Sequence, residues 1–248
     1  MAQKNKQELI DYVIALIDEV MPDSADGASQ ILQEAPVEKI EDQLDNSATF
    51  IIRNAPIELL AQIAKTGEFH APVAPGNAIT SRLIIDADTL VYTFVCPSDF
   101  KRFLSIKLTS WAQPIFELMD RKDARYRILS NKYTSPTWRK PQAVLIPFSK
   151  YVANEKNDLW INSGLALELF KGKTDSETID YFEYIPDTKA ENFPEELQDP
   201  IAWVCASRVL ESMRKLDLAK SAMNRAISQL QFKFGTQRED FNNGNRQQ

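Results

Sequence analysis

Apolar residues recur at helical spacing near both ends of the chain. In the N-terminal part these positions predict three helices, over residues 6–21, 37–53 and 57–65. In the last quarter Asp199 and Pro200 predict the start of another helix, because an aspartate N-cap followed by proline suits a first helical turn. A last helix, restarting at Asp217, carries an alanine-rich stripe that would allow another backbone to approach closely.

The pattern in the middle of the chain has a period of two. Residues 103–108 alternate polar and apolar positions, and so do residues 165–170. Further β-rich runs cover residues 79–85, 90–95 and 143–148, with turn-rich loops between them. This pattern predicts a small, largely antiparallel sheet.

Together these patterns predict an α+β fold, in which a helical bundle from the N- and C-terminal helices holds an inserted antiparallel β-rich middle. The predicted divisions are a helical domain at 1–70 and 194–234, a β-rich insertion at 78–193 and a flexible C-terminal arm at 235–248. The arm has one aromatic residue and no periodicity, so we expect it to be disordered on its own.

Charge is unevenly distributed along the 248 residues, whose net charge is −6. Residues 1–50 hold three basic and eleven acidic residues, residues 101–150 hold eleven and three, and residues 151–200 hold four and twelve. Such blocks would suit complementary surfaces between copies of one protein. Solvated faces that happen to cluster are the alternative interpretation.

The residues needed for catalysis are sparse. His70 is the only histidine, no serine has a nucleophile-elbow motif, and Cys96 and Cys205 lie in apolar runs typical of buried thiols. No metal-ligand spacing and no glycine-rich phosphate loop occurs. We therefore expect no enzyme activity, no metal and no cofactor, although a hydrolase site assembled only in the fold remains a further hypothesis. No run is long enough to span a membrane and no signal-peptide pattern is present, which favours a cytoplasmic origin without membrane partners.

The segment 121–140 interleaves cations with aromatic residues. Its members are Arg121, Lys122, Arg125, Tyr126, Arg127, Lys132, Tyr133, Trp138, Arg139 and Lys140. This composition is typical of surfaces that bind phosphates and stack bases. Tyr, Trp and Arg are also enriched at protein–protein hot spots, so contact with another protein is the favoured interpretation and DNA binding the alternative.

Two stretches of the chain resemble head-to-tail adaptor (connector) proteins of tailed bacteriophages, most closely the portal-proximal ring proteins of crAss-like gut phages. The first is RFLSIKLTSWAQPIFEL, continuing to RYRILSNKYTSPTWRKPQAVLI. The second is LALELFKGKTDSETIDYFEYIP, followed by FPEELQDPIAWVCASRVLES and LAKSAMNRA, and the N-terminal ATFIIRNAPIELL suits the same pattern. Their order along the chain, more than any single motif, carries the resemblance.

The resemblance implies a non-enzymatic virion protein that assembles in the host cytoplasm into a homo-oligomeric ring, usually of twelve copies. Such a ring lies in the neck, binds the portal and the next tail ring, and lets genomic DNA pass through its bore without specific binding. By analogy, the arm 235–248 would dock on the portal through Arg238, Phe241 and Arg246. Contacts to the neighbouring subunit or the next ring are expected at Arg125, Arg127, Tyr133, Trp138 and Arg139. Another neck or tail ring, such as a stopper or tail-completion protein, is the alternative within the same setting.

Overall fold

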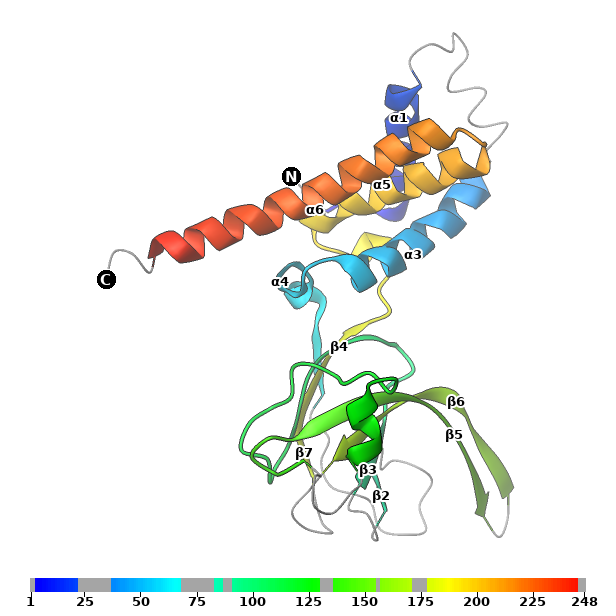
Figure 1. Cartoon of the computed structure of the whole chain (residues 1–248). Coiled ribbons are helices and arrows are strands. Elements are labelled where there is room, and N and C mark those ends of the chain that lie inside the picture. Colours follow the sequence, from blue (N-terminus) through cyan, green and yellow to red (C-terminus); the bar gives the residue numbers. More distant parts are fainter. Residues whose placement is uncertain are drawn as a thin grey trace. The chain divides into compact units, whose positions relative to one another are not determined.

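The computed structural model describes residues 3–21, 37–67, 83–86, 91–129, 136–154, 157–170 and 178–244. The chain forms two compact units (Figure 1): a helical unit of Met1–Ile63 with Asp187–Gln248, and a β unit of Ala64–Pro186. The predicted α+β class is confirmed, because helices from both ends of the chain form a bundle and the segment between them forms antiparallel sheets.

The helical unit is assembled around one central helix. Its described elements are α1 (Lys6–Val20), α3 (Val37–Asn54), α4 (Ile57–Leu60), the 3-10 turns η1 (Ala61–Ile63) and η3 (Ala190–Asn192), α5 (Glu195–Ser212) and α6 (Leu216–Gly244). Helices α1, α3 and α6 all pack against α5. Helix α1 begins with a capping box, in which the Asn5 side chain accepts a bond from the Glu8 N–H and the Glu8 carboxylate accepts one from the Asn5 N–H.

From Pro200 to Leu210 every residue of helix α5 except Arg208 is buried, which suits the apolar sequence of this part of the helix. Ser207 satisfies its hydroxyl by donating to the Ala219 carbonyl of α6 at 2.8 Å. The alanine stripe predicted from the sequence is buried as expected, at Ala219, Ala222 and Ala226. Small side chains at these positions let α6 lie close to α5.

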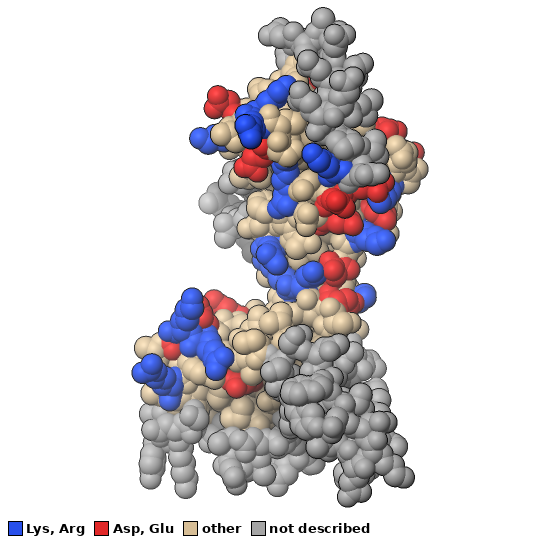
Figure 2. Space-filling model, turned by 90° about the vertical axis from the view of Figure 1, so that its right-hand side faces the viewer, with Lys and Arg blue, Asp and Glu red and all other residues tan. Residues whose placement is uncertain are grey.

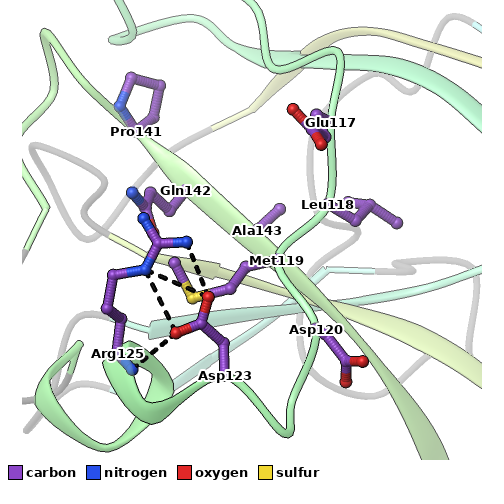
Figure 3. A pocket seen from close by; sticks show the side chains of 9 residues that line it. All are labelled: Glu117, Leu118, Met119, Asp120, Asp123, Arg125, Pro141, Gln142 and Ala143. Carbon is purple, nitrogen blue, oxygen red and sulfur yellow. Dashed lines mark hydrogen bonds and ion pairs between the residues drawn. The ribbon is translucent and has the colours of Figure 1, made fainter.

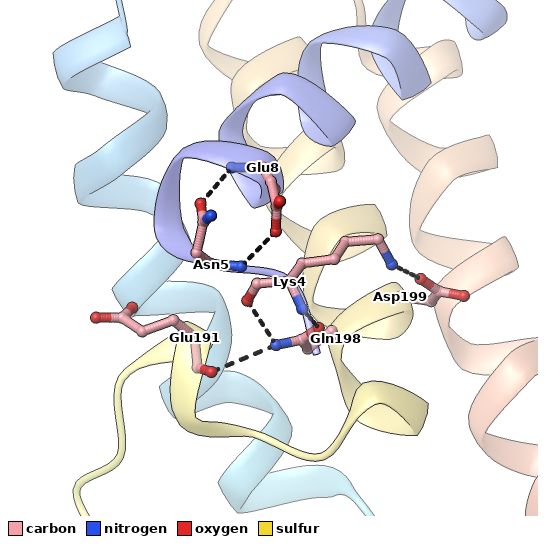
Figure 4. A network of polar contacts seen from close by, with 6 residues as sticks. All are labelled: Lys4, Asn5, Glu8, Glu191, Gln198 and Asp199. Atoms are coloured by element: carbon pink, nitrogen blue, oxygen red, sulfur yellow. Dashed lines mark hydrogen bonds and ion pairs between the residues drawn. The ribbon is translucent and has the colours of Figure 1, made fainter. Parts of the chain in front are cut away.

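A buried glutamine ties the start of the chain to the start of α5 (Figure 4). Gln198 accepts a hydrogen bond from the Lys4 backbone N–H at 2.9 Å and donates to the Lys4 carbonyl at 3.1 Å. Its amide also donates to the Glu191 carbonyl at 3.4 Å. The Lys4 ammonium pairs with Asp199 at 3.2 Å. A single side chain thus satisfies several backbone groups from distant parts of the sequence.

Three helix ends differ from the sequence-based prediction. The helix predicted over 57–65 is shorter, because α4 ends at Leu60, η1 ends at Ile63 and Lys65 begins a strand. Helix α5 begins at Glu195, so Pro200 lies inside the helix and Asp199 is not its N-cap. The helical turn before Pro200 buries Leu197 and Gln198. Because Pro200 lies near the start of the helix, it removes only one backbone hydrogen bond. Helix α6 continues to Gly244, so residues 235–244 are helical where the sequence predicted a disordered arm. A single glycine costs only about 1 kcal/mol in a helix and does not by itself end one.

The β unit contains two antiparallel sheets. In the first, β1 (Lys65–Gly67), β7 (Ile179–Pro186) and β4 (Phe100–Leu108) lie in that order. In the second, the order is β2 (Leu83–Asp86), β3 (Val91–Val95), β6 (Asn157–Phe170) and β5 (Gln142–Asn154). Strands β5 and β6 are longer than the runs 143–148 and 165–170 that the sequence predicted.

Aromatic rings from the two sheets form the core of the β unit. Phe182 of β7 contacts Phe94 of β3 edge-on, with ring centroids 4.8 Å apart, and stacks on Tyr184 at 5.1 Å. Phe100 and Trp111 are buried in the same cluster. The boundaries between the units fall at Ile63–Ala64 and Pro186–Asp187, because β1 belongs to the β unit and η3 to the helical unit. The sequence pattern predicted neither of these short elements.

Candidate interaction surface

The long connection between β4 and β5 packs back onto the β unit. Ile115 forms a β-bridge with Ile106 of β4, and Met119 forms a parallel bridge with Val144 of β5. The Ala112 N–H donates to the Trp138 carbonyl at 3.0 Å, which joins the two ends of the connection. This connection, which includes one of the predicted turn-rich loops, is therefore held to the β unit at these points.

A short 3-10 helix, η2 (Ala124–Ile128), carries two cations of this connection, Arg125 and Arg127. Asp123 caps it by accepting the Arg125 N–H at 2.9 Å, and its carboxylate binds the Arg125 guanidinium at 2.7 and 3.1 Å. Figure 3 shows the two side chains facing each other beside Gln142. The hydrogen bonds from Arg125 lower the pKa of Asp123. Arg125 therefore has a structural partner within its own loop, although its side chain is 69% exposed.

Tyr126 anchors η2 to the sheet. Its hydroxyl donates to the Glu168 carboxylate of β6 at 2.8 Å, and its ring meets Phe170 edge-on at 6.4 Å. The Arg121 guanidinium lies 5.9 Å from the centre of the Tyr126 ring. Burial, followed by the bond to Glu168, raises the pKa of Tyr126. The anchor leaves the neighbouring Arg127 exposed.

Large apolar side chains and cations remain exposed around this anchor. The indole of Trp138 is 38% exposed, with the Arg139 guanidinium 4.9 Å from its centre, and Ile128 is 46% exposed. We define the basic–aromatic surface by its exposed members in 121–129 and 136–140: Arg121, Lys122, Arg125, Arg127, Ile128, Trp138, Arg139 and Lys140. On the face of the β unit drawn in Figure 2, Lys and Arg gather with few carboxylates, whereas the two signs alternate over the helical unit.

Two shallow clefts are lined in part by residues of this surface. One, of about 420 Å³, is lined by Glu117, Leu118, Met119, Asp120, Asp123, Arg125, Pro141, Gln142 and Ala143. The other, of about 300 Å³, shares Met119, Arg125 and Gln142 with the first and adds Ile128 and Lys140. Asp120 accepts a bond from the Lys122 N–H, and Asp123 holds Arg125, so both carboxylates stabilise the loop. The lining of the two clefts contains no histidine, cysteine or serine.

The structure brings together only part of the predicted site. Arg125, Arg127, Trp138 and Arg139 lie on the basic–aromatic surface, but Tyr133 falls outside the described residues. Two residues of the predicted docking arm, Arg238 and Phe241, lie within helix α6. Arg246 and the lone histidine, His70, also fall outside the described residues.

Sequence reasoning missed the residues that hold this surface in place. Asp123 could have been predicted, because an aspartate side chain commonly accepts a hydrogen bond from the backbone N–H two residues later. Glu168 left no such signal, since it lies 42 residues from Tyr126 in the sequence. Gln142 lines both clefts, and its buried Oε1 accepts no hydrogen bond from any described residue.

The described residues also bear on metal binding, membrane insertion and thiol chemistry. Within the described ranges, no group of three His, Cys, Asp or Glu residues is placed to hold a metal ion. No helix there is both long enough and apolar enough to cross a membrane. Cys96 and Cys205 are free thiols, both buried, and burial raises the pKa of Cys205 to about 12. Neither a protein-family model nor a curated protein sequence matches the chain.

Proposed function

We propose that this chain is the subunit of a homo-oligomeric ring in the neck of a tailed bacteriophage, an adaptor between the portal and the tail. The observation that carries the proposal is the unequal charge of the two units. The helical unit holds 13 basic and 21 acidic residues, a net charge of −8, and the β unit holds 16 and 14, a net charge of +2. The resemblance of the two quoted stretches to adaptor proteins points in the same direction.

A ring subunit needs two different surfaces that fit each other, because each copy meets the next by a heterologous contact. The basic–aromatic surface supplies one such surface. On the helical unit, α3 exposes Asp42 and Asp45, which are candidates for the opposite surface. Opposite charges would guide the approach of copies and fix their register.

The same proposal assigns the remaining partners. The end of α6, with Arg238 and Phe241, and the residues beyond it, with Arg246, would dock on the portal. The exposed Trp138 and Arg139 would contact the neighbouring copy or the next tail ring. Genomic DNA would pass through the ring without specific binding, and the chain would form part of the virion with no catalytic role.

Electron microscopy of a reconstituted neck tests this function. Purified chain is mixed with portal rings of the same virus and imaged in negative stain. We expect an added tier beneath the portal that disappears when residues 235–248 are removed. The helical circular dichroism should fall only by the contribution of residues 235–244, with an unfolding midpoint close to wild type. Portals that remain bare at micromolar protein would contradict the adaptor role. A tier that forms only after another ring has bound would favour a stopper or tail-completion protein.

DNA binding is separated from ring formation by a second readout of the same samples. If the chain binds DNA, the basic–aromatic surface should retain duplex DNA, with an affinity that falls steeply as the salt concentration rises. We expect no retention at physiological salt. Retention that Arg127→Glu abolishes would favour the DNA-binding alternative.

A further inference from the structure

Strands β5 and β6 continue well past the sheet that contains them. They pair from Gln142↔Phe170 to Asn154↔Asn157. Strand β3 pairs with β6 only between Val91↔Phe170 and Val95↔Ala166. We call the two-stranded continuation, residues 148–154 and 157–164, the β ribbon. Figure 1 shows β5 and β6 running on together beyond β3.

The edges of these strands are covered near the core, but along the ribbon no described strand covers them. Met119 covers the β5 edge through its bridge to Val144, with the Met119 N–H bound to the Ala143 carbonyl at 2.9 Å. On the other edge, the Cys96 N–H bonds to Leu165 of β6 at 2.9 Å. Beyond these points no described strand pairs with either edge of the ribbon. An open edge presents a row of N–H and C=O groups that another strand can bind.

A β-bulge marks the place where the ribbon leaves the sheet. Phe148 pairs with Gly164, but Lys150 pairs with Ile161, so β6 has one extra residue in this interval. Bulges bend a strand and increase its twist. The ribbon is thereby redirected from the sheet at the point where its edges become open.

The cross-strand register places apolar residues on both faces of the ribbon. Tyr151 lies opposite Trp160 on one face, and Val152 lies opposite Leu159 on the other. A two-stranded hairpin alone is at best marginally stable in water, and a hairpin facing solvent on both sides is not expected to carry apolar residues on each. The pattern indicates that the ribbon has a partner.

We propose that the partner is the same ribbon of a neighbouring copy, with β6 of one copy paired to β5 of the next. The inference rests on the ring proposed above and names one of its contacts. Rotation about an axis that runs along the ribbons preserves strand direction. Because β5 and β6 are antiparallel within one copy, β6 meets the β5 of its neighbour in antiparallel orientation as well.

Length and charge make the two open edges complementary. The β5 edge has seven residues, 148–154, and the β6 edge has eight, 157–164. The first carries one cation, Lys150, and the second one carboxylate, Asp158. Repeated around a ring, this pairing leaves no open ribbon edge, which is how closed β structures remove their edges.

Cysteine cross-linking between copies tests the pairing. One variant carries Val152→Cys on β5, and a second carries a cysteine on β6, moved in turn through positions 158–162 so that the test does not depend on register. The natural Cys96 and Cys205 are buried and provide the background control. The thiol cross-linker is chosen short enough to join cysteines on adjacent strands, about 5 Å apart. It must not reach between cysteines on strands that have another strand between them. Ring formation is scored separately by electron microscopy.

We expect cross-linked dimers in the mixture of the two variants, at one or two positions of the scan, and none from either variant alone. Rings without a cross-link at any position would overturn the ribbon pairing and leave the ring proposal standing. Cross-links from Val152→Cys alone would mean that ribbons pair about a two-fold axis, which also overturns it. Cross-links in the mixture without rings would support the edge pairing and reject the ring.

A shortened hairpin gives an independent measurement. Replacing residues 149–163 by Asn-Gly joins Phe148 to Gly164, which already lie opposite each other. We expect the variant to keep the circular dichroism and unfolding midpoint of the monomer but to lose at least tenfold in assembly at equal concentration. Unchanged assembly would overturn the inference.

Discussion

The helical unit and the β unit each contain an arginine stacked on a tryptophan, and they use the pair in opposite ways. In the helical unit Trp203 is 5% exposed, and Arg225 lies 4.8 Å from its ring centre and pairs with Glu19 at 2.9 Å. In the β unit the corresponding pair, Trp138 and Arg139, has nearly the same separation, 4.9 Å, but the indole is 38% exposed.

The difference separates a side-chain pair that completes a fold from one that remains available for binding. Around Trp203 the apolar area is already buried, and the arginine has a carboxylate partner. Around Trp138 the area is open to solvent, together with exposed cations and Ile128. Exposed aromatic and arginine side chains of this kind become hot spots when a partner covers them.

Removing the two tryptophans is the strongest test of this comparison. We expect Trp203→Ala to reduce the free energy of unfolding by about 3–5 kcal/mol, because it leaves a cavity in the bundle. Trp138→Ala should cost less than about 1 kcal/mol. Urea denaturation followed by circular dichroism measures both, and equal losses would contradict the assignment of one pair to the fold and the other to the surface.

The buried amide of Gln198 should have the next largest effect. Gln198→Leu removes the bonds to the Lys4 N–H and carbonyl, and we expect a loss of about 1–3 kcal/mol. Lys4→Ala is the matched control, since it deletes the ion pair with Asp199 but keeps the backbone groups, and should cost no more than about 1 kcal/mol. A larger effect of the control would show that the ion pair, and not the amide, fixes the N-terminal residues.

Asp99 offers a smaller, pH-dependent effect in the β unit. Partial burial acts to raise the pKa of this carboxylate, but hydrogen bonds from Lys65 at 2.7 Å and Tyr184 at 3.0 Å prevail and lower it. Its contribution is therefore present above the unfolded pKa of about 3.9 and is lost as pH falls through the lower folded value. Since the side chain is 33% exposed, Asp99→Asn should cost less than about 1 kcal/mol near pH 6. Thermal melts should show the difference shrinking below about pH 4; a difference that grows there would be inconsistent.

Reversing a charge on the basic–aromatic surface should have the smallest effect on the fold. Arg127 is exposed, and among the described residues it has no ion-pair partner. We expect Arg127→Glu to change the free energy of unfolding by less than about 0.5 kcal/mol. Arg125→Glu should cost more, because it also breaks the bonds to Asp123. Equal stability of the two variants would show that the bonds between the Arg125 guanidinium and Asp123 contribute little to the fold.

The sequence predicted most elements but not their bulges or their exact ends. The alanine stripe of α6 follows the expected spacing, whereas β4 was found although register shifts against β7 interrupt its alternation and bury Ser105 beside Ile106. The β ribbon was not found. In β6 the bulge beside Gly164 shifts the phase of the alternation, and in β5 the polar Ser149 and Lys150 interrupt the apolar run. The start of α5 was misplaced because Pro200 normally marks a first turn.

The candidate site was predictable in composition but not in geometry. The cations and tryptophan of 121–140 were apparent from the sequence, and four of the five predicted contact residues lie on the described surface. The contacts that hold this segment in place are the hydrogen bond to Glu168 and the β-bridge to Val144, and both partners are distant from the segment in the sequence. Contacts of this kind depend on the register of the sheet, which no local pattern determines.

Sedimentation velocity of the full chain, wild type beside Arg127→Glu, tests whether charge on the basic–aromatic surface drives assembly. We expect wild type to assemble into a closed species of ring size as its concentration rises, and added salt to weaken this assembly. Arg127→Glu should remain a folded monomer under the same conditions. A wild-type chain that stays monomeric with and without portal rings, or a variant that assembles equally well, would contradict the claim that the basic–aromatic surface joins copies of this protein.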